Sequence, residues 1–203
     1  MKLKDKIKPK IPPLKNGIYM AVCVAVADIG DQYSAKFKNI QRKILFAFDI
    51  PSETIEVNGE IRPRQLSKRC TFTDSNRGTL IKVVNAWLNS KISERELRDM
   101  ELYDFAGKPC QIRVSVREDG VHNDVEDVMA LSKGMTIPTT DTPIIFYDID
   151  EDGFSGDKWD ALPQWLQDVV KKSEQYQKNP PDKPLDMPAD QAQPITGKDD
   201  CPI

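Results

Sequence analysis

The sequence predicts a mainly β domain built from antiparallel strands, and three observations support this prediction. Strand-like runs occupy residues 17–27, 43–73 and 110–131. One helical stretch, between about residues 80 and 102, interrupts them, whereas a parallel α/β sheet would need a helix after nearly every strand. The dipeptide Asn58-Gly59 separates two strand-like segments, and it favours the two-residue turn of a β-hairpin because both residues tolerate a positive φ.

The first strand is expected to begin at Gly17, where bulky and small side chains alternate with the period of two that a strand requires. The bulky face is expected to be core and consists of Ile18, Met20, Val22, Val24 and Val26. The opposite face begins with Tyr19 and otherwise carries small residues, so it is either a second buried face or a flat surface that receives a ligand.

Residues 28–41 are expected to form a loop in which aromatic residues are interleaved with cations. Its central part holds Tyr33, Lys36, Phe37 and Lys38. In one interpretation Phe37 folds back over the core as a lid. In the other, the aromatic rings stack on bases while the lysines contact phosphates. The spacing favours neither.

Residues 43–73 are expected to form one long hairpin around the Asn58-Gly59 turn. Its first strand, residues 44–50, is apolar on both faces, as a central strand of a small barrel should be. Its second strand, residues 64–73, carries Arg64, Lys68 and Arg69. Strand parity places Arg64 and Lys68 on the side of the apolar residues and Arg69 on the polar side. The polar side also holds Gln65, Ser67, Thr71 and Thr73.

A helical connection follows the hairpin. Its first helix should bury one apolar face, and Ser93 with Glu96 has the pattern of a capping box that opens a second, shorter helix. That apolar face consists of Leu80, Val83, Val84, Trp87 and Leu88.

Two more strands complete the domain. Residues 110–117 alternate cleanly and carry Arg113 and Arg117 on their outer face, and a weaker strand follows the turn at Asp119-Gly120. Three strands, a helical connection and two strands fit the five-stranded OB-fold barrel. The binding face of such a barrel uses strands two and three with the loops that here are residues 28–41 and 117–124.

The chain is expected to divide into three parts. Residues 1–134 form the OB-fold domain, residues 135–178 form a C-terminal extension with a helix at about 162–176, and residues 179–203 form a disordered tail that is rich in Pro, Asp and Gln. The helix is expected to pack on the barrel or on a second subunit, which would make the protein a homodimer. Its buried face would consist of Leu162, Trp165, Leu166, Val169 and Val170.

The charge is distributed unevenly over these parts. Residues 1–134 hold 23 Lys and Arg against 18 Asp and Glu, a net charge of +5, whereas residues 135–203 hold 6 against 14, a net charge of −8. A basic body with an acidic tail fits a domain that binds a polyanion and a tail that competes for the same surface or binds a partner.

Metal, cofactor and enzymatic chemistry are not expected. The four cysteines are far apart and there is one histidine, so a typical zinc-ligand set is missing. Residues 148–153 match the first half of a calcium loop, but Trp159 stands where the bidentate Glu should be, which favours a plain acidic turn. The sequence has no nucleophile elbow, P-loop or dinucleotide-binding motif.

A cytoplasmic location without membrane contact is expected. No run approaches the ~18 apolar residues of a membrane span, and the basic N-terminus lacks the apolar stretch of a secretion signal.

The last residues combine acidic side chains with a hydrophobic residue at the free carboxylate, which suits docking into an apolar pocket with a basic rim. Asp199, Asp200, Pro202 and Ile203 resemble the acidic C-terminal tip of bacterial single-stranded DNA-binding proteins. Cys201 stands where such tips carry Ile or Leu, and Ile203 stands where they carry Phe.

The body resembles phage-encoded single-stranded DNA-binding proteins with an OB fold, over roughly residues 1–170. The similar stretches are residues 8–14, 17–19, 63–68, 102–110 and 146–153. The resemblance implies a protein without enzymatic activity that coats single-stranded DNA during phage replication or recombination in the cytoplasm of the bacterial host. It also implies that the tip recruits replication or recombination proteins.

We therefore expect single-stranded DNA binding with little sequence preference, through phosphate contacts and base stacking. Either Phe46 or Phe48 should face the groove, and strand parity cannot decide between them because a single bulge exchanges the two faces. The alternative is a protein-interaction module of a replication or recombination complex, in which the basic residues are merely solvated. The candidate DNA-binding residues are Tyr19, Tyr33, Lys36, Phe37, Lys38, Arg42, Lys43, Phe48, Arg64, Lys68, Arg69, Arg113 and Arg117.

Overall fold

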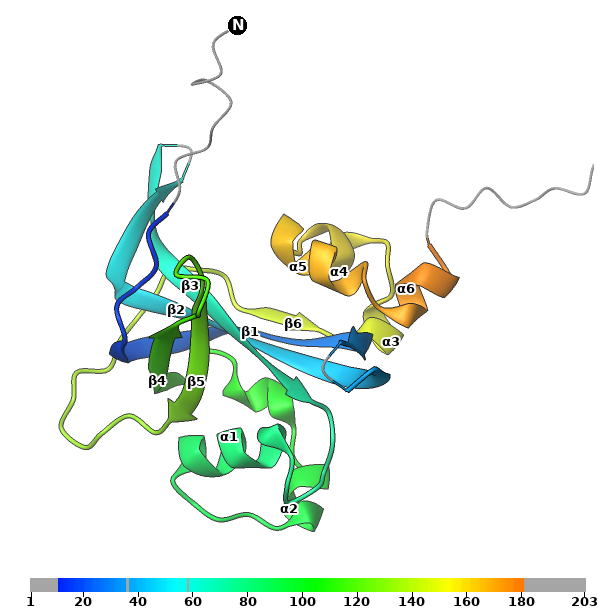
Figure 1. Cartoon of the computed structure of the whole chain (residues 1–203), viewed down its shortest axis with the longest axis horizontal. Helices are drawn as coiled ribbons and strands as arrows, with labels where there is room; N and C mark the ends of the chain where they lie inside the picture. Colours follow the sequence, from blue (N-terminus) through cyan, green and yellow to red (C-terminus); the bar gives the residue numbers. More distant parts are fainter. Residues whose placement is uncertain (1–10, 36, 58, 181–203) are drawn as a thin grey trace, which may run out of the picture.

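The computed structural model describes residues 11–35, 37–57 and 59–180. In this part of the chain six strands form one sheet, with one group of short helices between β3 and β4 and a second group after β6 (Figure 1). The strands are β1 (Gly17–Ser34), β2 (Asn39–Val57), β3 (Glu60–Thr71), β4 (Pro109–Val116), β5 (Asn123–Met129) and β6 (Ile145–Tyr147). The helical elements are α1 (Thr79–Leu88), α2 (Glu94–Arg98), the 3-10 helix η2 (Leu102–Phe105), α3 (Ile149–Asp152), α4 (Asp157–Asp160), α5 (Gln164–Val170) and α6 (Glu174–Lys178). Within the described residues, none of these helices has the length and apolar character needed to cross a bilayer.

The strand order is β3-β2-β1-β4-β5, with every neighbour antiparallel, and β6 adds to β1 in parallel. The start of β1 pairs with β4 and the remainder pairs with β2, so the long β1 joins the two halves of the sheet. The prediction of a mainly β antiparallel architecture with a helical connection after the third strand is confirmed. No ladder joins β3 to β5 in the described residues. Instead, Lys68 Nζ on β3 donates hydrogen bonds to the carbonyl oxygens of Val125 and Glu126 on β5, each at 2.7 Å.

The predicted hairpin is present and longer than expected. Val57 pairs with Glu60, and Gly59, just before Glu60, has a φ of 85°. A bulge between Ile50 and Thr54 interrupts the pairing, and beyond it the two strands continue as an arm. We call residues 54–63 the β2–β3 arm.

The prediction that residues 28–41 form a loop is wrong, because β1 continues to Ser34 and β2 already begins at Asn39. Polar residues are accommodated in this part of β1 by a bulge between Asp28 and Asp31, at which Gly30 adopts a φ of 71°. The Asp28 carboxylate accepts a hydrogen bond from the Gly30 N–H at 2.8 Å. A β-carbon on Gly30 would lie 2.6 Å from Ile149 Cδ1, so the bulge also brings the chain against α3.

The inner face of the sheet forms the main core with the helical connection. The predicted apolar face of α1 points into this core except for Leu88, which is 40% exposed. The Trp87 ring lies 6.0 Å from the Phe46 ring and 4.7 Å from the Phe105 ring. The predicted capping box of Ser93 and Glu96 is present at the start of α2. On β1 the expected bulky face is buried only from Val22 onward, and the small-residue face is buried as well, which is one of the two expected alternatives. Ala21 and Cys23 face the main core, and a bulge between Cys23 and Ala25 then turns Val26 toward it. Ile18, expected in the core, is 56% exposed.

The outer face of β1 and β2 is buried beneath the C-terminal extension. Residues of both strands, such as Ala27 and Leu45, pack with Tyr147, Trp159 and Leu166 in a second apolar cluster. This cover explains why the middle of β2 is apolar on both sides. The predicted single helix over 162–176 is wrong, because α5 ends at Val170 and the buried Ser173 caps a separate α6.

Candidate nucleic-acid interface

The outer face of β3 around Ser67 and Arg69 is not buried beneath the C-terminal extension. Arg69 lies opposite Leu45 and Ser67 lies opposite Ala47, so both share the outer face with covered residues of β2, yet both are exposed. Cys70 lies opposite Ile44 and belongs to the inner core. The sequence-based assignment of Arg69 to the polar face is therefore confirmed.

Arg69 is the cation of this face that carries no ion pair within the described residues. Partial burial of its guanidinium, together with the nearby charge of Arg117, lowers its pKa. Two guanidinium groups held near each other repel, and a bound anion would remove that repulsion. The arrangement is therefore suited to a phosphate.

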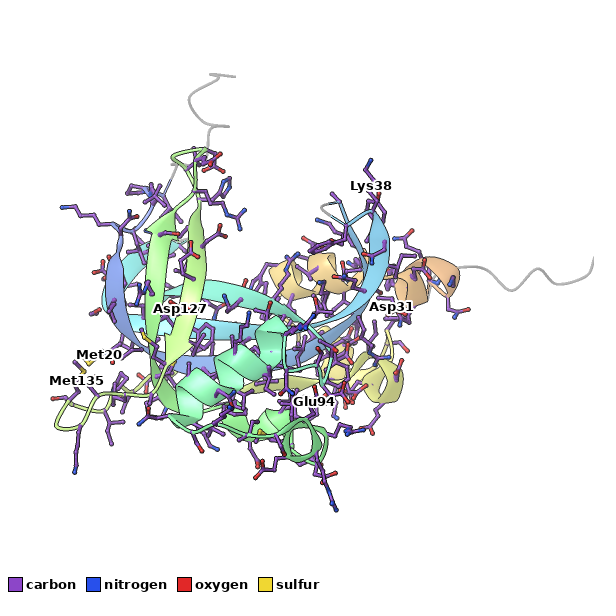
Figure 2. The ribbon with its side chains drawn as sticks, turned by 60° about the horizontal axis from the view of Figure 1, so that its bottom comes forward. Met20, Asp31, Lys38, Glu94, Asp127 and Met135 are labelled. Atoms are coloured by element: carbon purple, nitrogen blue, oxygen red, sulfur yellow. The ribbon has the colours of Figure 1, made fainter. Side chains whose placement is uncertain are left out.

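Two hairpins project from the sheet in the same direction in Figure 2, one with Lys38 near its tip and the other with Asp127 on β5. On the β1–β2 hairpin, Tyr33 and Phe37 are 67% and 61% exposed. Lys38 adopts a φ of 51° at the turn and is also exposed. Exposed aromatic rings beside a lysine are chemically suited to stacking on bases. Lys36, another candidate, lies outside the described residues.

The β4–β5 hairpin carries two arginines that are already paired. Arg113 Nε lies 3.3 Å from Asp127 Oδ2, and Arg117 Nη2 lies 2.5 Å from Asp124 Oδ1. All four side chains are about half exposed, and exposed pairs of this kind contribute only ~0.2–1 kcal/mol each. A phosphate could therefore compete with either aspartate for its arginine.

Three further candidate cations lie less openly. Lys43 is half-buried and donates to Gln41 Oε1 and Thr71 Oγ1, both at 2.6 Å, and burial lowers its pKa. Arg64 is half-buried opposite Ile50. Lys68 is held by the two carbonyl oxygens of β5 described above. As strand parity predicted, Arg64 and Lys68 lie on the opposite face of β3 from Arg69.

Arg42 connects β2 to both β1 and the C-terminal extension. Its guanidinium lies 2.6 Å from Asp28 Oδ2 and 2.6 Å from Asp150 Oδ2. Burial lowers the pKa of Arg42, but the two carboxylates outweigh this effect, so the net shift is upward. Burial raises the pKa of Asp28, and the guanidinium of Arg42 offsets this rise only in part. Arg42 is thus occupied by two internal carboxylates.

The expectation that either Phe46 or Phe48 faces a groove is wrong. Both side chains are 0% exposed and pack around Trp87, because the even-numbered residues of this part of β2 all point into the core. Tyr19 is half-buried against the same core, and its hydroxyl donates to the Lys15 carbonyl oxygen at 2.8 Å. Of the four predicted stacking positions, only Tyr33 and Phe37 present exposed rings.

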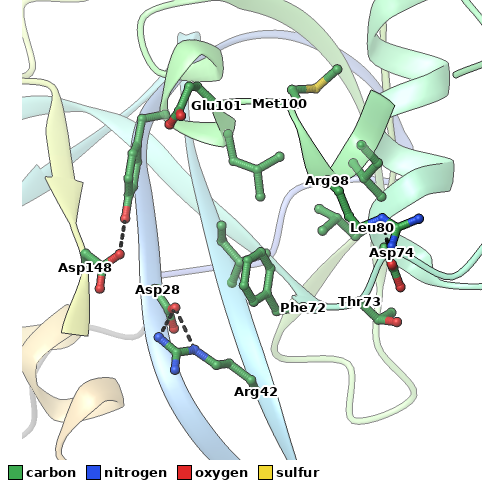
Figure 3. A pocket seen from close by; sticks show the side chains of 14 residues that line it. Asp28, Arg42, Phe72, Thr73, Asp74, Leu80, Arg98, Met100, Glu101 and Asp148 are labelled. Carbon is green, nitrogen blue, oxygen red and sulfur yellow. Dashed lines mark hydrogen bonds and ion pairs between the residues drawn. The ribbon is translucent and has the colours of Figure 1, made fainter. Parts of the chain in front are cut away.

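A cavity of about 520 Å³ lies where Asp28 of β1 and the first part of β2 approach α2 and η2 (Figure 3). Its floor is apolar, with Ile44 and Leu80, and Phe72, which is 50% exposed, stands at its side. The rim carries Arg98 and several carboxylates. Arg98 Nε lies 3.3 Å from Asp74 Oδ2, so this rim is not an open cationic surface.

A larger groove, of about 860 Å³, lies between the β2–β3 arm and the C-terminal extension. Its walls include Ile61 and Arg62 from the arm and Trp165 from α5, and its floor reaches Gln65 and Ser67 on β3. Sequence reasoning missed this groove, because Trp165 occupies an apolar helix position that predicted complete burial. In the structure Trp165 packs only at the edge of the second apolar cluster.

Comparisons with protein-family models, with curated proteins and with solved structures found no match. The predicted tip residues Asp199, Asp200, Pro202 and Ile203 lie outside the described residues. The arguments below accordingly rest on the surface of residues 11–180.

Proposed function

We propose that this protein binds single-stranded DNA with little sequence preference on the outer face of β3, between the β1–β2 and β4–β5 hairpins. The observation that carries the proposal is Arg69, an exposed cation without an ion pair in the described residues, on a face that the C-terminal extension leaves open. Exposed rings on one hairpin and exposed arginines on the other supply the stacking and phosphate contacts that sequence-independent binding needs.

In this proposal the sheet is a partly open OB-fold barrel. The strand order and the helical connection support that architecture, and the Lys68 contact between β3 and β5 would be its seam. The two projecting hairpins then correspond to the loops that usually flank nucleic acid on this fold. The protein would coat DNA during phage replication or recombination in the host cytoplasm, with its acidic tip recruiting partner proteins.

Fluorescence polarisation of labelled oligo-dT over a salt series tests the proposal. Four phosphate contacts would give a slope of log K against log salt near −2.8, so affinity should fall roughly 50-fold between about 50 and 200 mM salt. Arg69→Ala should reduce the slope by about 0.7. Absence of oligo-dT binding at about 50 mM salt would overturn the proposal.

The second candidate is a protein-interaction module without direct DNA binding. The pairing of Arg113 with Asp127 and of Arg117 with Asp124 favours it, because these pairs leave less unpaired positive charge for phosphates. In that case the Arg69 face would bind an acidic protein segment, and oligo-dT would not compete for it.

A further inference from the structure

We propose that the groove beside the β2–β3 arm is part of the single-stranded DNA path, and that Trp165 stacks on a base there. This inference rests on the proposed function and extends it to a residue of the C-terminal extension. The groove measures about 860 Å³, which falls within the ~300–1,000 Å³ typical of ligand pockets, so it has room for a nucleobase.

Continuity with the β3 face is the first argument. Gln65 and Ser67 line the groove, and they belong to the same outward-facing row of β3 as Arg69. At ~3.3 Å per residue, Arg69 follows Ser67 by about 7 Å along the strand. A strand of DNA held at Arg69 and running along β3 toward the arm therefore enters the groove directly.

The state of Trp165 is the second argument. The other two tryptophans, Trp87 and Trp159, are 5% and 7% exposed and lie in the two apolar clusters, whereas Trp165 is half-buried at the groove wall. Among the residues that the structure describes, the indole N–H of Trp165 has no acceptor and its ring contacts no other aromatic ring. In the described residues no buried side-chain nitrogen or oxygen atom lacks a hydrogen-bond partner, so the N–H of Trp165 faces solvent. It is therefore available to a ligand in the groove.

The charges of the groove indicate how DNA would lie in it. Arg62 stands on the arm, where it pairs with Glu60, and the exposed Asp141 lies on the opposite wall. Asp49 at the floor is 1% exposed and accepts hydrogen bonds from Thr140 Oγ1 at 2.7 Å and Gln65 Nε2 at 3.0 Å. Phosphates would therefore follow the β3 side, where the arginines are, and bases would turn toward the apolar wall and Trp165.

Intrinsic tryptophan fluorescence tests this inference in the full-length protein. Stacking on a base quenches indole emission, and the two buried tryptophans cannot stack on DNA without unfolding. Oligo-dT should therefore quench part of the emission of the wild-type protein, and Trp165→Phe should abolish that quenching while oligo-dT still binds by polarisation. Trp165→Ala should weaken binding roughly 5- to 150-fold, the loss expected for one stacked base.

The salt dependence separates stacking from an indirect effect on the sheet. Trp165→Ala removes no charge, so its salt slope should equal that of the wild type, whereas Arg69→Ala should lower the slope by about 0.7. Leu88→Ala, which truncates an apolar side chain that is 40% exposed on α1, is the matched control and should leave both affinity and quenching unchanged. Oligo-dT binding of wild-type affinity by Trp165→Ala, or quenching that persists in Trp165→Phe, would overturn this inference alone. Failure of the wild type to bind oligo-dT would instead overturn the proposed function.

Discussion

Lys68 and Arg69 are neighbours on β3, and the structure gives them opposite roles that a matched pair of substitutions can separate. Lys68 Nζ donates to two carbonyl oxygens of β5, whereas the guanidinium of Arg69 has no hydrogen-bond acceptor in the described part of the chain. We therefore expect Lys68→Met to lower stability and Arg69→Met to lower DNA affinity. Methionine retains an apolar stem of comparable length in both variants, so the comparison isolates the charged group.

The magnitude for Lys68→Met follows from its two bonds. A hydrogen bond that involves a charged group contributes ~1.5–3 kcal/mol, and the half-buried position of Lys68 limits the pair to about that value in total. For a protein of this size, each kcal/mol shifts the melting temperature by ~2–4 °C. We expect thermal unfolding of Lys68→Met about 3–12 °C below that of the wild type. Arg69→Met should stay within ~0.5 kcal/mol of the wild type, as exposed substitutions usually do.

Calorimetry or circular dichroism gives the melting temperatures, and the oligo-dT salt series gives the slopes. Arg69→Met should lose about 0.7 from the slope and Lys68→Met should retain it at temperatures where it is folded. The reverse pattern, with a stable Lys68→Met that has lost slope, would show that Lys68 contacts phosphate and that β3 and β5 do not depend on it.

Three further outcomes are expected. Phe48→Ala should destabilise the protein by ~3–5 kcal/mol because it empties a fully buried position. Tyr33→Ala should leave the denaturant midpoint unchanged and weaken oligo-dT binding by ~1–3 kcal/mol. Equal destabilisation by both substitutions would contradict the burial pattern. Burial raises the pKa of Cys23 from 9.0 to about 12, so the smaller thiolate fraction should slow labelling of this thiol at pH 8 roughly 10³-fold. Mass spectrometry of the Cys23 peptide separates its labelling from that of the other free cysteines, and fast labelling of the native protein at this position would argue against a buried thiol. Gly30→Ala should lower the free energy of unfolding by more than ~1 kcal/mol, because the φ of Gly30 is 71° and the added carbon would lie 2.6 Å from Ile149 Cδ1. Chemical denaturation measures this loss, and a midpoint equal to that of the wild type would mean that α3 does not pack on this bulge.

The hairpin and helical connection could be predicted because their signals are local. Asn58-Gly59 marks the turn, the apolar stripe around Trp87 marks α1, and Ser93 with Glu96 marks the start of α2. In contrast, the extension of β1 to Ser34 depends on a bulge whose polar groups are satisfied locally and by distant residues. For example, Gln32 Nε2 donates to the Val169 carbonyl oxygen at 3.2 Å.

The candidate site was predictable where strand parity is unambiguous. Arg69 lies among polar neighbours, so its face could be read directly. Phe48 could not be assigned, because Leu45 and Ala47 are also apolar and the alternation disappears when both faces of a strand are buried. The partial exposure of Trp165 could not be predicted, because the spacing of apolar residues on a helix shows which side chains face a core but not where that core ends.

The cover over β1 and β2 also constrains the order in which the molecule can fold. β1 emerges first from the ribosome, yet its outer face is completed by residues such as Trp159 and Leu166. Contacts of this kind join residues as far apart as Asp31 and Gln175, 144 positions along the chain, and such distant pairings slow folding because a long loop must close first. A nascent chain that has reached residue 134 already contains every strand of the antiparallel sheet, but it still exposes the apolar outer side of β1 and β2. Until synthesis passes about residue 170, that surface is open to aggregation or to a chaperone.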